Sequence, residues 1–430
     1  MNYSQTLEFL YTSLPAFESK GASAYKPGLE RIAAFCKHMG NPQRNFFTVH
    51  VAGTNGKGST CACIAAVLRS AGYRVGLNTS PYLVTFHERI QVDGEMISDG
   101  DLVSMVEEIR PAAEAMAEHP TEFELITAIA LLYFRRRKCD ISVLEVGLGG
   151  ALDASNVIDV PEAAVLTAMG MDHVALLGST QADVAAAKAG IIKPGGDVVS
   201  YGGCPEADAV FRRVCGERGA RLREVDFSRL HLCSAELEGT SFNFAPCQGL
   251  RLPLVGVYQV KNAAVALTTL EVLREKGWYV PEDAVRRGLA AVRWPGRLEV
   301  LRREPVFLLD GAHNAHGMAA AAESLRALFP GRKIVFLVGL LADKDVSAML
   351  DVLVPLAEWV FTLRPESPRA MEAELLAGLL AERGVPARPC GTAGEGVRAA
   401  AEAAGRSGIV CALGSLYLSG DIRRAVEETL

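Results

Sequence analysis

Short apolar runs alternate with longer alanine-rich stretches over about the first two thirds of the chain. The apolar runs have the length and composition of strands buried on both faces of a sheet, and they occupy residues 46–51, 141–146 and 163–167. The alanine-rich stretches predict helices at residues 59–70, 126–134 and 180–189. Gly72 is expected to end the first of these helices. The alternation predicts a mostly parallel sheet with helices on both faces.

Two interruptions divide this α/β pattern. Between about residues 197 and 253, two runs predict antiparallel strands at 230–237 and 241–245, which we interpret as a small β excursion attached to the first domain. The segment Trp294-Pro295-Gly296-Arg297 breaks the pattern again. Strands are then expected at 306–309, 334–338, 360–363 and 409–413, with helices between them. We therefore expect an N-terminal domain over residues 1–296 and a smaller, Rossmann-like α/β domain over residues 297–430.

Composition excludes several classes of function. Of the 430 residues, 50% are hydrophobic and 22% are charged, and the formal net charge is -6. This charge argues against broad electrostatic binding of nucleic acid, which needs a cationic surface. No stretch is long and apolar enough for a membrane span, and the first residues do not resemble a secretory signal, so a cytoplasmic protein is expected. The ten cysteines are scattered, which favours free thiols.

A glycine-rich loop joins the first predicted strand to the following helix. Residues 53–60 read Gly-Thr-Asn-Gly-Lys-Gly-Ser-Thr. Such a loop lets backbone N–H groups approach phosphate oxygens at a helix N-terminus, where the helix dipole favours negative charge. Lys57 would lie near the β- and γ-phosphates of a nucleoside triphosphate. The spacing departs from the general P-loop pattern at Gly53 and at Gly58, and a purely structural glycine turn is the alternative.

The loop resembles that of the Mur ligase superfamily and, within it, the folylpolyglutamate synthase/dihydrofolate synthase family. Further segments match this family in the family's own order. They are Thr79 to Leu83 with Glu88 to Ile90; Glu145 to Gly150 with Leu152 and Asp153; Met171 to His173; Lys188 to Ile191; Gln259 and Asn262; Trp294 to Arg297; Asp310 to Asn314; and Gly414-Ser415. The resemblance extends from about residue 25 to about residue 420 and implies a Mur-ligase-like P-loop domain followed by a glutamate ligase-type domain.

The resemblance also implies a reaction. ATP phosphorylates a substrate carboxylate, and the amine of L-glutamate then attacks the acyl phosphate to form an amide. The family uses dihydropteroate or a folate as the acceptor and two Mg²⁺ ions, and its members are mostly monomers. No nucleic acid or membrane partner is expected.

Site residues carried over from the family fall into four groups. For catalysis they are Lys57, His173 and Lys188, a candidate carbamylated lysine. For ATP they are Gly53, Asn55, Gly56, Lys57, Gly58, Ser59, Thr60, Asn262, Arg297, Asp310 and His313. For metal they are Ser80, Glu145 and His173, and for the acceptor they are Lys26, Pro27, Gly28, Leu29, Tyr82, Thr121, Glu122, Phe123, Glu124 and Asp153.

Each of these residues also has a simpler interpretation. Glu145 can be a sheet-end carboxylate paired with a base, and Lys188 can be a plain surface lysine. His173 can be an ordinary loop histidine, Asp310 a turn former, and Phe123 a core residue.

The chain departs from the family pattern at four positions. The family usually has His where Tyr82 and Tyr258 stand, a basic residue at Ala151 and Glu at Ala187. Two alternatives therefore stay open. One is a Mur-type ligase for another carboxylate, such as a peptidoglycan precursor, and the other is a nucleotide-binding protein without ligase turnover.

Overall fold

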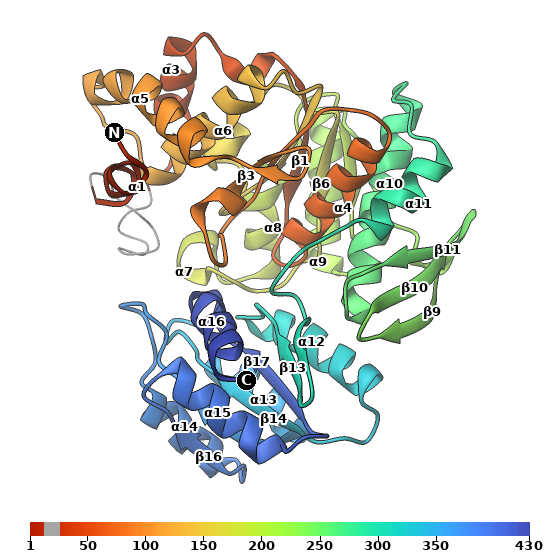
Figure 1. The fold of residues 1–430 in the computed structure, drawn as a ribbon. Coiled ribbons are helices and arrows are strands. Elements are labelled where there is room, and N and C mark those ends of the chain that lie inside the picture. The colour runs from red at the N-terminus through yellow and green to blue at the C-terminus, as the bar shows by residue number, and fades with distance from the viewer. Residues whose placement is uncertain (13–25) are drawn as a thin grey trace. The chain divides into compact units, whose positions relative to one another are not determined.

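The computed structural model describes residues 1–12 and 26–430, which divide into two compact units. The first unit holds residues 1–229 and 262–292, and the second holds residues 230–261 and 293–430. Each contains a mostly parallel sheet with helices packed against it, which confirms the expected α/β class (Figure 1).

The first unit is organised around an eight-stranded sheet with the strand order β4-β3-β2-β5-β1-β6-β7-β8. Its strands are β1 (Phe47–Ala52), β2 (Val75–Asn78), β3 (Ile90–Val92), β4 (Glu95–Met96), β5 (Ile141–Glu145), β6 (Ala163–Leu166), β7 (Asp197–Ser200) and β8 (Arg221–Glu224). All are parallel except β3 and β4 at one edge. Strand β1 lies between β5 and β6, so its end and theirs meet at one edge of the sheet.

The helices of this unit follow the predicted pattern. They are α1 (Tyr3–Thr12), α3 (Glu30–His38), α4 (Lys57–Ser70), α5 (Asp99–Ala115), α6 (Glu122–Arg136), α7 (Val174–Leu177), α8 (Gln181–Ala189), α9 (Pro205–Arg218), the C-terminal part of α10 (Val257–Glu275) and α11 (Glu282–Ala290). Helix α4 contacts β1, β2 and β5, whereas α6 contacts β2 and α5. The predicted stop at Gly72 is confirmed, because this residue has φ 96° just after α4.

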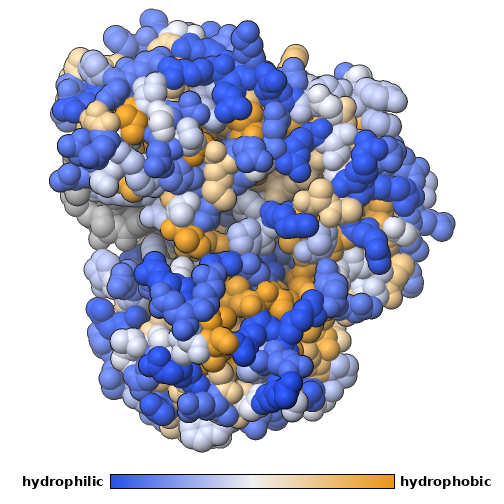
Figure 2. Space-filling model, in the orientation of Figure 1, coloured by the Kyte–Doolittle hydropathy of each residue, from blue (hydrophilic) through white to orange (hydrophobic). Residues whose placement is uncertain are grey.

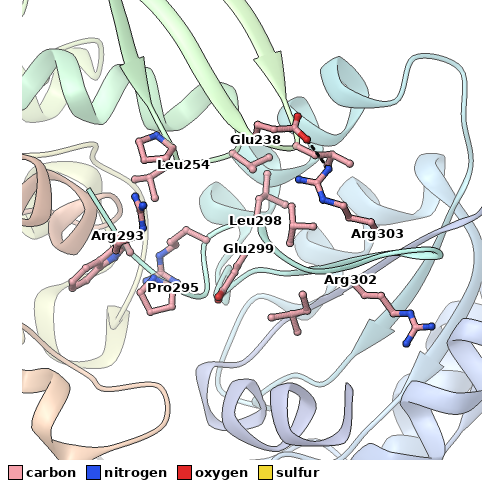
Figure 3. A pocket seen from close by; sticks show the side chains of 15 residues that line it. Glu238, Leu254, Arg293, Pro295, Leu298, Glu299, Arg302 and Arg303 are labelled. Atoms are coloured by element: carbon pink, nitrogen blue, oxygen red, sulfur yellow. Dashed lines mark hydrogen bonds and ion pairs between the residues drawn. The ribbon is translucent and has the colours of Figure 1, made fainter. Parts of the chain in front are cut away.

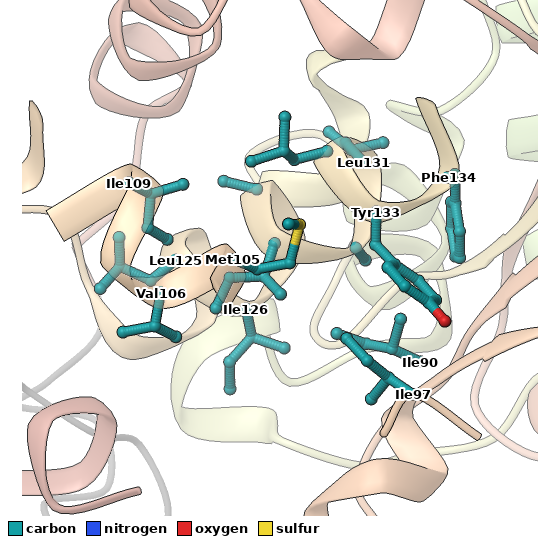
Figure 4. Close-up of a cluster of buried hydrophobic side chains, with 14 of the residues drawn as sticks. Ile90, Ile97, Met105, Val106, Ile109, Leu125, Ile126, Leu131, Tyr133 and Phe134 are labelled. Atoms are coloured by element: carbon teal, nitrogen blue, oxygen red, sulfur yellow. The ribbon is translucent and has the colours of Figure 1, made fainter. Parts of the chain in front are cut away.

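An apolar cluster of this unit lies around α6. Leu125, Ile126 and Leu131 pack with Met105 and Ile109 of α5, all of them almost fully buried (Figure 4). Side chains at helical spacing form this contact, as the pattern of apolar residues in 126–134 predicts. The cluster holds α6 against the sheet, and it thereby positions the polar N-terminus of α6.

The second unit contains two sheets. The strands β9 (Leu230–Glu236), β10 (Gly239–Phe244) and β11 (Cys247–Leu252) form an antiparallel sheet. A six-stranded sheet has the order β12-β13-β17-β14-β15-β16, with only β12 antiparallel to its neighbour. Its strands are β12 (Glu299–Arg303), β13 (Val306–Leu309), β14 (Ile334–Val338), β15 (Ala357–Thr362), β16 (Ala387–Pro389) and β17 (Ile409–Leu413), and its helices are α12 (Ala315–Leu328), α13 (Val346–Leu353), α14 (Ala373–Glu382), α15 (Ala393–Ala404) and α16 (Ser419–Thr429).

The three-stranded sheet groups with the second unit, although the sequence suggested attachment to the first. Two contacts explain this grouping. Glu238 pairs with Arg303 at 2.6 Å, and the backbone N–H of Val257 donates to Ser324 Oγ at 3.0 Å. The expected domain limits at residues 296 and 297 stay a prediction.

Helix α11 packs so closely on α4 that residue 288 must be small. A Cβ at Gly288 would lie 2.5 Å from the Cα of Val67. We expect Gly288→Ala to destabilise the first unit by about 1–3 kcal/mol through overpacking. Gly216→Ala is the matched control, because Gly216 is exposed in α9 and a Cβ there meets no other atom within 4 Å. That change should stabilise by about 0.5–1 kcal/mol.

The free energy of unfolding of this unit can be measured in urea titrations in which unfolding is monitored by hydrogen exchange of α4 and α11 peptides, since both helices belong to the first unit. Equal effects of the two substitutions would contradict the packing argument.

Candidate active site

The glycine loop lies at the edge where β1, β5 and β6 end. The backbone N–H groups of Thr54 and Asn55 donate to the carbonyl of Ala168, at 3.1 and 3.2 Å, which ties the loop to the segment after β6. Gly56 has φ 83° and directly precedes α4, and the side chain of Asn262 occupies the space where a Cβ would be. No side chain caps α4. The first-turn N–H groups therefore face the loop without intrahelical acceptors, as an anion site requires.

Lys57 and Glu145 place opposite charges beside this helix N-terminus. Lys57 is the first residue of α4, and its Nζ lies 3.9 Å from Glu145 Oε1 and 3.4 Å from the Thr54 carbonyl. Glu145 ends β5, is 4% exposed, and accepts a hydrogen bond from the Ser80 backbone N–H at 3.2 Å. The structure brings these three residues together, although they are far apart in the sequence. Glu145 is thus a sheet-end carboxylate paired with a base, as its simpler interpretation states. The base is Lys57, which belongs to the glycine loop.

Lys188 lies inside the protein and not at its surface. It is 5% exposed at the end of α8, and its Nζ donates to the Gly53 carbonyl at 2.8 Å. The interpretation as a plain surface lysine is therefore wrong. Burial, and then the charge of Lys57, lower the pKa of Lys188 to about 7, although Asp172 and Asp153 act in the opposite direction. A neutral amine is thus accessible near neutral pH.

His173 lies at a strained backbone position next to Asp172. Its φ of 51° places it in the left-handed region, where non-glycine residues are uncommon. Its backbone N–H donates to Asp172 Oδ1 at 2.8 Å, and its Nε2 lies 4.0 Å from the same oxygen. The side chain is about one third exposed, so it is accessible to a ligand.

Asp153 holds the turn that follows β5. Its Oδ2 accepts the backbone N–H groups of Gly147 and Leu148, at 3.1 and 2.9 Å. Its Oδ1 accepts the backbone N–H and the hydroxyl of Ser155, at 3.0 and 2.5 Å. The ring of Phe123 packs on the same turn, 2.6 Å from where a Cβ of Gly147 would lie, so Phe123 is partly a packing residue.

The other residues expected on the acceptor side surround the N-terminus of α6. Thr121 and Glu124 form a capping box, and Glu124 also pairs with Arg31 at 3.3 Å. Glu122 is 5% exposed, and the Oε1 atom of Glu124 is buried without a hydrogen-bond partner. The exposed residues Lys26 and Pro27 precede Gly28 and Leu29, and the Lys26 carbonyl accepts a hydrogen bond from Arg31 at 2.7 Å.

In the second unit, Asp310 is a hub of hydrogen bonds at the end of β13. Its Oδ2 accepts the Tyr258 hydroxyl and the Leu298 N–H, at 2.7 and 2.8 Å, and its Oδ1 accepts the Ala312 N–H at 2.7 Å. Asp310 is thus a turn former, and Tyr258, one of the family departures, serves as its partner. His313 Nδ1 lies 2.8 Å from the Gly311 carbonyl.

Arg297 lines a pocket of about 650 Å³ in the second unit (Figure 3). Residues 293–303 form most of its wall, and the remainder comes from residues 237–238 and 253–255. The ion pair of Arg303 with Glu238 lies at its margin, and Arg297 also contacts the loop at Gly311.

Two of the family departures lie next to each other. The backbone N–H of Ala151 donates to the carbonyl of Ala187 at 2.9 Å. The two positions at which the family usually has a basic and an acidic residue are therefore neighbours in the structure. A third departure, Tyr82, lies with its ring under the guanidinium of the buried Arg89, at 5.1 Å from the ring centroid.

The described residues contain neither a group of metal ligands nor a membrane-spanning helix. Among residues 1–12 and 26–430, no three His, Cys, Asp or Glu side chains are grouped to hold a metal ion. Over the same residues, no helix has both the length and the hydropathy needed to cross a bilayer. The visible surface is mostly polar, with apolar side chains in small groups (Figure 2).

A parallel sheet with a glycine loop that leads into an uncapped helix, beside a paired lysine and glutamate, defines a nucleotide-binding enzyme of the P-loop type. Family models agree: the Mur ligase middle domain matches residues 51–270, and the glutamate ligase domain of Mur ligases matches residues 296–416. The chain belongs to the Mur ligase family and, within it, to the folylpolyglutamate synthases/dihydrofolate synthases. It is thus an ATP-dependent ligase.

Individual relatives support this assignment. The folylpolyglutamate synthase of Lacticaseibacillus casei is 40% identical over 86% of this chain and 87% of its own length. The dihydrofolate synthase/folylpolyglutamate synthase of Bacillus subtilis is 36% identical over 94% and 95%. A solved FPGS–AMPPCP–folate complex is similar to this structure with a TM-score of 0.81 at 34% identity, covering 99% of this chain and 100% of that one.

Sequence reasoning missed a buried polar pair behind the turn held by Asp153. His50 Nε2 lies 2.8 Å from Ser155 Oγ, and both residues are fully buried. Burial, and then the charge of Lys193, lower the pKa of His50 to about 3, so the ring is neutral near pH 7. The available signal was a histidine inside an otherwise mostly apolar strand.

Lys57→Ala tests the charge at the glycine loop. We expect ADP formation to fall by at least about a hundredfold, because a preorganised cation at a transferring phosphoryl group contributes on that scale. Lys37→Ala is the control, since Lys37 is an exposed lysine of α3 in the same unit. Circular dichroism checks the fold of both variants. A Lys57→Ala protein with wild-type turnover would contradict the assignment of this lysine.

Proposed function

We propose that the protein joins L-glutamate to dihydropteroate, to a folate, or to both, through an acyl phosphate formed with ATP. The contact of Lys57 with Glu145 at the N-terminus of α4 carries this proposal. It joins a cation for the transferred phosphoryl group to a carboxylate suited to Mg²⁺. Family membership supports the nature of the acceptor. The protein is proposed to act as a monomer in the cytoplasm.

The two chemical steps assign different tasks to the chain. First, an acceptor carboxylate oxygen attacks the γ-phosphorus of ATP, the bond to the bridging oxygen breaks, and ADP leaves. Lys57 and the first-turn N–H groups of α4 offset the negative charge on the phosphoryl oxygens. Second, the glutamate amine attacks the acyl carbon, loses a proton, and phosphate leaves through a tetrahedral intermediate.

Of the residues expected at the metal, Glu145 and Ser80 fit Mg²⁺ in kind, because this ion prefers oxygen ligands, which the imidazole of His173 does not offer. Glu145 supplies a buried carboxylate, Ser80 lies beside it, and His173 is accessible. Bound Mg²⁺ would neutralise charge on the phosphate oxygens. So few protein ligands are normal for this ion, which keeps several waters and binds substrate phosphates.

Nucleotide contacts are proposed for two sets of residues. Around the phosphates we propose Gly53, Asn55, Gly56, Gly58, Ser59, Thr60 and Asn262, and further ATP contacts are proposed for Arg297, Asp310 and His313. The Thr60 hydroxyl is buried without a hydrogen-bond partner, which fits a group that awaits a ligand. On the acceptor side we place residues 26–29, Tyr82, residues 121–124 and Asp153.

Lys188 is proposed to carry a carbamate. Its neutral amine would attack CO₂, a C–N bond would form, one C=O electron pair would move onto oxygen, and a proton would leave. Burial of the amine favours this reaction, because only the neutral form is nucleophilic. The resulting anion would orient phosphate or metal beside Lys57.

An acceptor assay tests the proposed reaction. Pure protein with ATP, Mg²⁺, L-glutamate and either dihydropteroate or a folate should release ADP and form the glutamylated product. If neither acceptor yields ADP while another carboxylate, such as a peptidoglycan precursor, does, the protein is a ligase for that acid. ATP binding without turnover on any acid would indicate a nucleotide-binding protein that has lost ligase activity.

The carbamate has its own test. With a pKa of about 7, the neutral fraction of Lys188 rises from about one tenth at pH 6 to about nine tenths at pH 8. Crystals grown with bicarbonate at pH 8 should therefore show added density at Nζ, and crystals at pH 6 should show much less. Activity should rise with bicarbonate near pH 6 in the wild type but not in Lys188→Ala. An unmodified ammonium at pH 8 would refute the carbamate.

A further inference from the structure

A chain of buried hydrogen bonds connects the central strand to the turn after β5. His50 of β1 contacts Ser155, Ser155 contacts Asp153, and Asp153 holds the N–H groups of Gly147 and Leu148. Every side chain in the chain of contacts is at most 4% exposed. Of these residues, only Asp153 has a role in the proposed function.

The donors and acceptors along this chain have one consistent assignment. Burial raises the pKa of Asp153, but three backbone N–H donors favour its ionised form. An ionised carboxylate can only accept, so the Ser155 hydroxyl donates to it. Ser155 Oγ must then accept from His50, which requires the proton on Nε2 of a neutral imidazole. This assignment leaves His50 Nδ1 as a buried acceptor, and it has no hydrogen-bond partner.

An unsatisfied nitrogen in the most central strand of the sheet is unfavourable for stability, and an apolar residue would avoid it. The neighbours of His50 in register are Leu144 of β5 and Ala164 of β6, both apolar. The hydrogen bond from Nε2 to Ser155 therefore explains why a histidine occupies this position, and packing does not.

The turn held in this way lies next to one residue of the proposed metal site and one residue of the proposed acceptor side. Glu145 lies directly before it, and Phe123 packs on Gly147. The Ala151 carbonyl just beyond the turn accepts a hydrogen bond from the Asn156 side chain at 3.0 Å, so the turn is fixed from the segment 154–157 as well.

We propose that His50 is a positioning residue for the acceptor: through Ser155 it orients Asp153, which belongs to the proposed acceptor side, and the turn 147–150 that Asp153 holds. The proposal rests on the acceptor side of the proposed function. His50 touches no substrate itself. Its removal should loosen the turn and weaken acceptor binding, with little effect on the nucleotide.

The test compares variants along the chain with a matched control. His50→Leu and Ser155→Ala each break it, whereas His50→Gln retains an N–H donor near the position of Nε2. Thr48→Val is the control, because Thr48 points to the same face of β1, and its hydroxyl makes a buried hydrogen bond of 3.1 Å to Ser142, away from Asp153.

In the two disrupting variants, amide exchange at Gly147 and Leu148 should accelerate by about tenfold, as the loss of one buried hydrogen bond implies. The KM for the acceptor should rise by a similar factor, while the KM for ATP stays within about twofold. His50→Gln should restore most of the wild-type exchange rate and most of the wild-type KM for the acceptor. Thr48→Val should change neither quantity. If His50→Leu does not fold, Ser155→Ala provides the same comparison.

Unchanged exchange at both amides, equal rises in the two KM values, or the same effects in Thr48→Val would overturn the proposal. Exchange is measured without substrate. A wild-type protein that ligates no acceptor would therefore refute the proposed function, and the exchange data would still decide whether His50 orders the turn.

Discussion

The arrangement of the first unit depends on the pairing of β1 with β5 on one side and β6 on the other. The register places Val51 beside Glu145 of β5 and Val165 of β6, so three strands end at the same edge. The glycine loop and the segment before His173 begin at this edge, and the carboxylate of Glu145 lies there. The carboxyl ends of parallel strands are where ligands gather in open α/β sheets.

Charge balance at this edge explains the unusual environments of its side chains. Lys57 and Lys188 both lie near the Gly53–Thr54 backbone, and their mutual repulsion contributes to the lowered pKa of Lys188. The negative charge of Glu145 partly balances the positive charge of Lys57. A bound phosphate group, or a carbamate on Lys188, would add the further negative charge that balances both lysines. The edge is thus prepared for an anionic ligand before one binds.

The turn after β5, on the proposed acceptor side, is ordered differently, through hydrogen bonds to one buried carboxylate and through packing. Asp153 accepts four hydrogen bonds from the chain itself, and Phe123 closes on the Gly147 backbone. These contacts make the turn after β5 rigid. Two of the four departures from the family pattern, Ala151 and Ala187, meet at the end of this turn.

The sequence by itself determined the local elements and the chemistry of the glycine loop. Strands β13, β14 and β17 begin and end at the predicted residues, because period and composition encode which residues face the core. Only the tertiary structure decided which distant side chains meet: Lys188 with the carbonyl of Gly53, Glu145 with Lys57, His50 with Ser155, and Tyr258 with Asp310. It also grouped the three-stranded sheet with the second unit. The reason is physical: local patterns fix the direction of a side chain within its element, whereas a contact across 105 or 135 residues depends on strand register and helix packing.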